Sequence, residues 1–489
     1  MLGPLLSACL LILFGLVGFY RPVWGFGLLI LLYQTLFNLG GPIAVPLPVG
    51  YVEPTEVLIA SMAMGLWSKS RERHQVRGPG TKKLIRPPAD MRRLWLAMGS
   101  YILWQSLCVV KALGSLRGTD NFRYGVRFIL AGCLPWVALY ILRKMSSKDG
   151  HKVFKTAYVL SIATAIVHIA IQVVNNRAVI KAAYYFILPD GSDQYANFVE
   201  GNLQEDFVRG LPQGALLMLF FLVLNVGQLI FNKARPRIGA VAATMLIFSA
   251  LFITITRSFM MCFLAGTLVC AALAFLSKSF NAKASVRALV VCFTLVACAA
   301  TYEAIRPGFL QTWAERVALL SGVDSQVFSA ENGARGLDNL ASIAAISDRP
   351  VMGFGSPYYP EEYSLRTGTF SDVHPMLMVG VLGGIPGMLL IVWFQWELFF
   401  PCLRDLWRRR EAARELVPFV SVLIMSMCVV NVIGAGGSIY GPPIICVVIF
   451  TNEMWNRRPQ QRVVLCDGLP ERDHARIQST AHFDPHPVV

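Results

Sequence analysis

The fold of this protein is decided by residues 211–276, which read LPQGALLMLFFLVLNVGQLIF (211–231), NKARPR (232–237), IGAVAATMLIFSALFITIT (238–256), a single Arg257 and SFMMCFLAGTLVCAALAFL (258–276). Each of the three apolar stretches is close to the ~20 residues that an α-helix needs to cross a bilayer. A short basic segment joins the first two stretches, and one arginine joins the last two. This pattern predicts consecutive membrane-spanning helices.

The composition of the whole chain agrees with that reading. Of its 489 residues, 55% are hydrophobic and only 15% are charged, and the mean hydropathy is +0.54. Soluble domains carry about 25% charged residues. These values exclude a soluble enzyme, a disordered chain and a small disulfide-rich scaffold.

Apolar stretches of similar length recur on both sides of residues 211–276. The predicted spans are 2–20, 22–39, 51–67, 94–113, 125–142, 156–174, 211–231, 238–256, 258–276, 288–305, 375–400, 416–434 and 437–452. We therefore predict an all-α polytopic membrane protein with about 12–13 transmembrane helices.

The basic residues predict the orientation of these spans. Segment 68–93 holds nine Lys and Arg, and calling it cytoplasmic places 31 of the 44 basic residues on the cytoplasmic side. The long external loop 306–374 has five Arg and no Lys, against eight acidic residues. The net charge of +15 is therefore explained mostly by membrane topology, and we expect no nucleic-acid partner.

The predicted organisation is one helix bundle with a polar tail. The bundle spans 1–455, with an external N-terminus, and a mobile cytoplasmic tail covers 456–489. Two external loops, 175–210 and 306–374, are long enough to fold, and loops carry chemistry more often than the scaffold does.

Arg257 is the charged residue most indicative of function, because it lies between two spans with almost no loop. It is either a topological cap or an anion site at the external membrane surface. In the loop 306–374, helices are expected over 310–320 and from Gly333 to about Ser347, followed by a turn at Gly353–Gly355.

Further candidates lie in the same loop. Arg335 stands at the start of the second expected helix, where a cation opposes the helix dipole, so a different partner is expected to hold it. His374 is the one histidine of this loop and directly precedes the span 375–400. The aromatic residues suit either packing or stacking on sugar faces: Tyr358, Tyr359 and Tyr363. No motif of a tight metal site or of an ATP-binding loop is present.

Three segments together resemble the superfamily of O-antigen ligases and O-antigen (Wzy-like) polymerases, which are bacterial inner-membrane glycosyltransferases of the GT-C class. They are TITRSFMMCFLAG (253–265), ARGLDNLASIAAISDRPVMGFG (334–355) and DVHPMLMVGVLGGIPG (372–387). Arg335 stands fifteen residues before Pro350, as the family pattern has it. The chain departs from that pattern at Asn339, Pro375 and Gly383, where the family usually has an aromatic residue, Asn and Glu.

The resemblance implies a GT-C-like bundle whose active site faces the periplasm. The donor would be an undecaprenyl-diphosphate-linked oligosaccharide, and the reaction would invert the sugar without a metal or other cofactor. Arg257 and Arg335 would bind the diphosphate and stabilise the leaving group, while His374 would act as general base. Secondary candidates for holding phosphate or orienting the histidine, each also suited to surface salt bridges, are Arg306, Arg316, Arg349 and Asp372.

Three other readings stay open. An O-antigen ligase would use the same donor but transfer the glycan to a lipid or protein acceptor. A transporter or flippase of lipid-linked or anionic substrates would use external arginines equally well. A scaffold of a polysaccharide-export complex would need no catalytic residues. The main interpretation is a polymerase of a surface or exopolysaccharide. Its acceptor would be a glycan, and its partners would be chain-length regulator or export proteins.

Overall fold

A computed structural model gives the structure of this protein. It describes residues 4–33, 43, 45–47, 50–52, 54–76, 89–113, 147–174, 185–187, 193–195, 198–199, 209–210, 214–231, 238–254, 257–276, 282–305, 307–318, 339–355 and 375–408.

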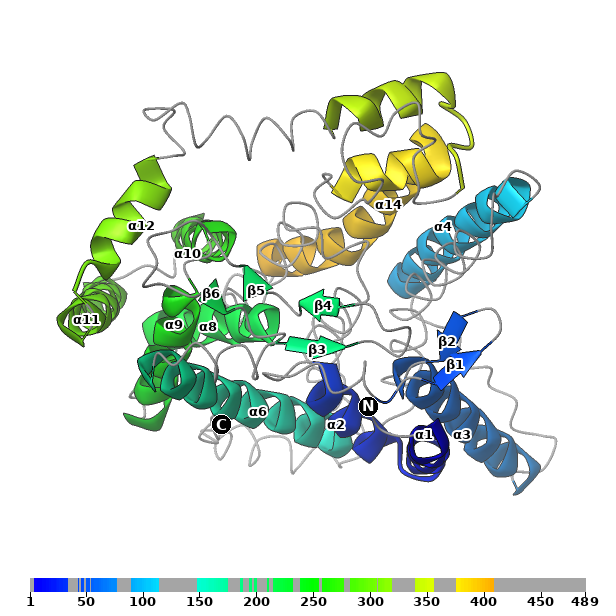
Figure 1. Cartoon of the computed structure of the whole chain (residues 1–489), viewed down its shortest axis with the longest axis horizontal. Helices are drawn as coiled ribbons and strands as arrows, with labels where there is room; N and C mark the ends of the chain where they lie inside the picture. Colours follow the sequence, from blue (N-terminus) through cyan, green and yellow to red (C-terminus); the bar gives the residue numbers. More distant parts are fainter. Residues whose placement is uncertain are drawn as a thin grey trace, which may run out of the picture.

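Within these residues the protein is mainly helical (Figure 1). The long helices are α1 (Pro4–Tyr20), α2 (Pro22–Tyr33), α3 (Pro54–Val76), α4 (Ala89–Leu113), α6 (Ser147–Val174), α8 (Ala215–Phe231), α9 (Ile238–Ile253), α10 (Arg257–Leu276), α11 (Ala282–Ile305) and α14 (Pro375–Arg408). Each corresponds to one predicted span. The remaining predicted spans, 125–142, 416–434 and 437–452, lie outside the described residues.

Four helices of the described part are long and apolar enough to cross a bilayer: Arg92–Ala112, Lys152–Val174, Lys283–Ile305 and Met376–Phe394. Shorter apolar helices accompany them, among them Leu5–Tyr20 and Ala215–Ile230. This set supports an α-helical membrane protein.

Several helices extend past the predicted spans into charged segments. α3 continues to Val76, inside the basic segment 68–93, and α14 continues to Arg408. Lys, Arg and Glu are good helix formers, so a helix does not stop where its apolar run stops. The apolar stretch therefore marks the membrane-embedded part of each helix and not its ends.

Short strands, which the all-α prediction did not include, pair as three antiparallel hairpins among the described residues. β1 (Val45–Leu47) pairs with β2 (Gly50–Val52). Two further pairs lie in the predicted external loop 175–210: β3 (Tyr185–Ile187) with β4 (Asp193–Tyr195), and β5 (Phe198–Val199) with β6 (Arg209–Gly210).

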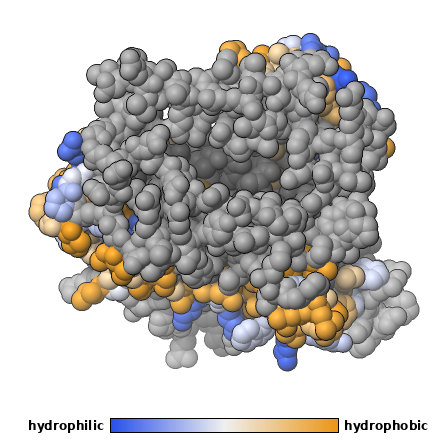
Figure 2. Space-filling view, viewed as in Figure 1, coloured by the Kyte–Doolittle hydropathy of each residue, from blue (hydrophilic) through white to orange (hydrophobic). Residues whose placement is uncertain are grey.

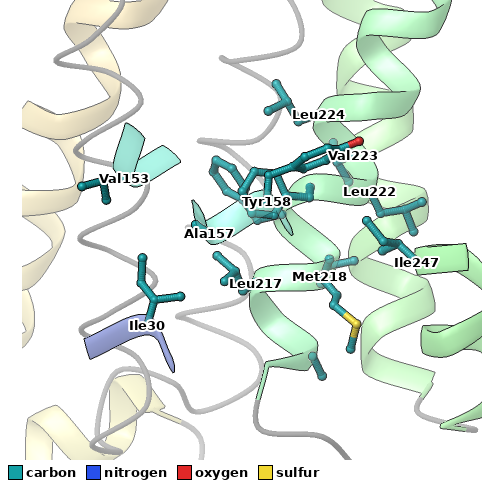
Figure 3. Packing of buried hydrophobic residues seen from close by; sticks show 14 of the residues in the cluster. Ile30, Val153, Ala157, Tyr158, Leu217, Met218, Leu222, Val223, Leu224 and Ile247 are labelled. Carbon is teal, nitrogen blue, oxygen red and sulfur yellow. The ribbon is translucent and has the colours of Figure 1, made fainter. Parts of the chain in front are cut away.

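The core of the bundle surrounds α8. Residues 217–224 of this helix are almost completely buried on every side, as expected for a helix that is apolar all round. Figure 3 shows Leu217, Met218 and Leu222 of α8 between Tyr158 of α6 and Ile247 of α9. α8 is therefore the central helix on which α6, α9, α10 and α11 pack.

Apolar side chains also cover the outside of the described helices. Leu5 of α1 is 81% exposed and Phe293 of α11 is 77% exposed. Figure 2 shows hydrophobic side chains along the lower edge of the view, where α1 and α6 lie in Figure 1. An exposed apolar surface of this kind is what contact with lipid requires.

Candidate functional site

The turn between α9 and α10 carries Arg257. Thr254, which follows α9, is fully buried and donates its hydroxyl proton to the Leu251 carbonyl oxygen at 2.7 Å. Arg257 is the first residue of α10, where a cation opposes the helix dipole. Arg257 therefore does not stabilise the start of α10. The side chain of Arg257 is not part of what the structure describes.

The start of the long loop packs on this turn through aromatic rings. α12 (Phe309–Ala318) follows α11, close to the expected helix 310–320. Trp313 stacks on Phe252 with ring centroids 5.2 Å apart, and its Nε1 donates to the Phe252 carbonyl oxygen at 3.2 Å. Phe309 contacts both Phe252 and Tyr302. The rings thus anchor the first helix of the loop beside the segment that leads to Arg257 (Figure 1).

Glu303 makes the sharp connection between α11 and α12. Its carboxylate accepts a hydrogen bond from the Gly308 N–H at 2.8 Å and from the Leu310 N–H at 2.6 Å. A carboxylate at a helix N-terminus satisfies backbone donors that have no partner in the helix and interacts favourably with the helix dipole. Glu303 is not among the predicted site residues, although an acidic residue shortly before Pro-Gly and an amphipathic helix was a usable signal.

The second anchor of the loop lies at a break in α14. A helix over 339–348 leads into the segment Arg349–Gly355. The N–H groups of Phe354 and Gly355 donate to the carbonyl oxygens of Val381 and Leu382 at 2.7 and 2.9 Å. The Ile385 N–H in turn donates to the Pro350 carbonyl oxygen at 2.7 Å. Arg349–Gly355 therefore supplies hydrogen-bond partners for backbone groups of α14 that lose their partners within the helix at the break.

Glycine is required at this junction because the backbone is left-handed and crowded. Gly384 has φ 66° and interrupts α14, and a Cβ there would lie 2.4 Å from the Val351 carbonyl oxygen. Gly353 (φ 56°) and Gly355 (φ 66°) are equally crowded. The expected turn at Gly353–Gly355 is present. Gly384, by contrast, was not predicted to break a helix.

α4 completes the junction. Trp104 Nε1 donates to the carbonyl oxygen of Gly383 at 2.7 Å. Gln105 is only 2% exposed, and its Nε2 has no hydrogen-bond partner among the described residues. A Cβ on Gly383 would lie 2.6 Å from that Nε2, so the amide rests directly against the break. Gly355 lies over the carbonyl oxygen of Cys108, toward the C-terminal end of α4. The C-terminal half of α4 therefore packs against α14 at its break (Figure 1).

A buried polar stripe on α6 was missed by the sequence analysis. Ser161, Thr164, His168 and Gln172 recur every three or four residues, and each is at most 4% exposed. His168 has a hydrogen bond with the backbone of Ala250, near the end of α9. The helical spacing of these four polar residues was the available signal in the sequence. Polar groups inside membrane helices either hold helices together or serve function.

The structure places only part of the predicted site. Arg349 is exposed, and its guanidinium carbon lies 4.5 Å from the centre of the Phe354 ring, a cation–π contact. For Arg316 only its place in α12 is described. His374 directly precedes Pro375, the first residue of α14. The remaining predicted site residues lie outside the described residues: Arg306, Arg335, Tyr358, Tyr359, Tyr363, Asp372 and His374.

In the part of the chain that the structure describes, no group of three or more His, Cys, Asp or Glu could hold a metal ion. No family model and no curated protein matches this chain.

Proposed function

We propose that this protein is a polytopic GT-C-like glycosyltransferase of the bacterial inner membrane. It would polymerise the repeat units of a surface polysaccharide or exopolysaccharide at the periplasmic face, with an undecaprenyl-diphosphate-linked glycan as donor. The N-terminus would be periplasmic and the C-terminus cytoplasmic.

One observation carries most weight. The segments Pro350–Gly355 and 381–385 belong to two of the three family-like motifs, and three backbone hydrogen bonds join them. The glycines at this junction, Gly353, Gly355 and Gly384, cannot be replaced by another residue without strain. Two motifs that are apart in the sequence form one structural unit. This supports a shared origin of the pattern over a chance match of isolated motifs.

The anchors also suit a reaction in the long loop. α12 holds the start of the loop beside the turn that bears Arg257, and Arg349–Gly355 holds its later part on α14. Arg335 lies between these anchors in the chain, and His374 follows directly before α14. An active site that must exclude side reactions benefits from such tethering of an otherwise long loop.

The proposed chemistry is a single displacement at the anomeric carbon C1 of the donor. His374 accepts the proton of the acceptor hydroxyl, whose oxygen forms a bond to C1. The bond between C1 and the diphosphate oxygen breaks, and its electron pair leaves with undecaprenyl diphosphate. Arg257 and Arg335 bind that diphosphate bidentately and stabilise the growing charge. Attack from the opposite face inverts C1.

The decisive experiment is a reconstitution of the purified full chain in nanodiscs. A lipid-diphosphate-linked oligosaccharide is added in the presence of EDTA, and the products are separated on a gel. A ladder of lengths is expected. A single new band that appears only when a lipid or protein acceptor is added would make the protein an O-antigen ligase instead.

A transporter or flippase is the second candidate, because two observations favour it. A broken membrane helix and a buried polar stripe, as in α14 and α6, are typical of transporters. No turnover under any condition, with binding of the lipid-linked glycan retained, would replace the glycosyltransferase proposal with this one.

A further inference from the structure

A separate pocket lies between α8, α9 and α11, toward the end of the bundle opposite the Arg257 turn. It encloses a volume of about 230 Å³ and is lined by Leu229, Thr244, Met245, Val290 and Thr294, together with Arg287. Leu229 is close to the end of α8, and Arg287 is close to the start of α11. The pocket therefore lies at the bundle end where the sequence predicts the cytoplasmic side.

The walls of this pocket are hydrocarbon. Its two hydroxyl groups are already used inside their own helices, since Thr244 donates to the Ala240 carbonyl oxygen at 2.7 Å and Thr294 to that of Val290 at 2.8 Å. The surface that lines the pocket is almost entirely apolar. A sugar would find no free hydroxyl partner there, whereas an alkyl chain fits.

The depth and the opening of the pocket suit a chain that enters from the lipid. Leu229 and Thr244 are 8% and 2% exposed, whereas Val286 and Val290 on the rim are each 60% exposed. The lining of α11 extends from Val286 to Leu295, about 14 Å along the helix axis. The pocket is thus a slot that runs along the membrane helices and opens on their lipid-facing side.

Positive charge is concentrated at one end of this slot. Among the described residues that line the pocket, Arg287 is the one that is ionisable. The segment 232–237, which joins α8 to α9, carries three basic residues, and 277–287 carries three including Arg287; neither segment contains Asp or Glu. Basic residues beside a membrane surface attract anionic headgroups, and a guanidinium matches the geometry of a phosphate.

We propose that this pocket binds one acyl chain of an anionic phospholipid from the adjacent leaflet, with the lipid phosphate held by Arg287. Such a lipid would fill the slot between α11 and the α8–α9 pair and so stabilise the packing of α11. The site is independent of the proposed glycosyl transfer and stands if that function fails.

The test is native mass spectrometry of the purified full chain in detergent with equimolar dioleoyl phosphatidylglycerol and dioleoyl phosphatidylcholine. The wild type is expected to retain one phosphatidylglycerol in preference to phosphatidylcholine. Arg287→Gln should lower that preference about tenfold. Val290→Trp, which fills the slot from its exposed rim, should lose both lipids.

Matched controls separate this site from general lipid contact. Lys155→Gln removes an exposed cation of α6, and Phe293→Trp enlarges an exposed residue of α11 outside the pocket. Both should bind as the wild type does. An unchanged preference in Arg287→Gln would overturn the proposal. Displacement of phosphatidylglycerol by an equimolar lipid-diphosphate-linked glycan would also overturn it, by assigning the pocket to the donor's hydrocarbon tail.

Discussion

The backbone N–H of Ile385 donates a 2.7 Å hydrogen bond to the carbonyl oxygen of Pro350, although the two residues lie on opposite sides of the segment 356–374. Inside a bilayer a broken helix is tolerated only where protein or water supplies the missing partners. Here the partners come from the long loop itself. The loop and the break in α14 are therefore parts of one structure, and changes at either should affect both.

Gly384→Ala tests this coupling. The backbone at Gly384, with φ 66° and ψ −168°, is one that essentially only glycine adopts, and it costs another residue about 1–3 kcal/mol. The new Cβ would also meet the Val351 carbonyl oxygen. We expect a clear fall in the thermal unfolding midpoint in detergent. Gly99→Ala is the matched control, because a Cβ at that exposed position of α4 meets nothing within 4 Å. Equal midpoints for the two variants would contradict the arrangement.

Gln105→Met tests the buried amide beside the break. A buried polar group without a hydrogen-bond partner costs about 1–3 kcal/mol, and methionine has a similar shape. The variant should therefore unfold at a higher temperature than the wild type. A lower unfolding temperature would mean that Gln105 is bonded to a residue outside those described. Ser106→Ala removes a hydroxyl that bonds only along its own helix and serves as control.

Trp313→Phe tests the anchor of the loop on the α9–α10 turn. Phenylalanine keeps a ring against Phe252 but loses the Nε1 donor to the Phe252 carbonyl oxygen, a loss of about 0.5–1.5 kcal/mol. Hydrogen exchange of α12 should become faster while that of α8 stays unchanged. Trp24→Phe, at a 71% exposed position of α2, should leave both rates as they are.

Three substitutions test the proposed chemistry. Arg257→Ala and Arg335→Ala should each lower product formation by about 100-fold or more, and His374→Ala by a similar factor, because transition-state charge and proton transfer lose their partners. Membrane insertion and yield should stay normal. Arg366→Ala changes another arginine of the same loop that lies outside the family-like segments, and it should retain activity. Wild-type activity in Arg257→Ala and His374→Ala would rule out the mechanism.

A large part of the fold was predictable because hydrophobic length is a local property. Ten predicted spans coincide with helices of the described part. The predicted loop helix 310–320 likewise coincides with α12 (Phe309–Ala318). Predictions were poorer where a residue's role depends on a distant partner. His168 of α6 is bonded to the backbone of Ala250 in α9, and a partner so far away in the sequence cannot be read from the residues near His168.

The sequence by itself determined that this chain forms apolar helices and where most of them lie, because the bilayer demands a long apolar run for each span. It also determined that Gly353–Gly355 would turn. Only the tertiary structure decided that Gly384 breaks α14 and that Pro350–Gly355 occupies the break. A glycine between apolar residues serves equally for close helix packing or for a left-handed break. The choice depends on whether another segment satisfies the freed backbone groups.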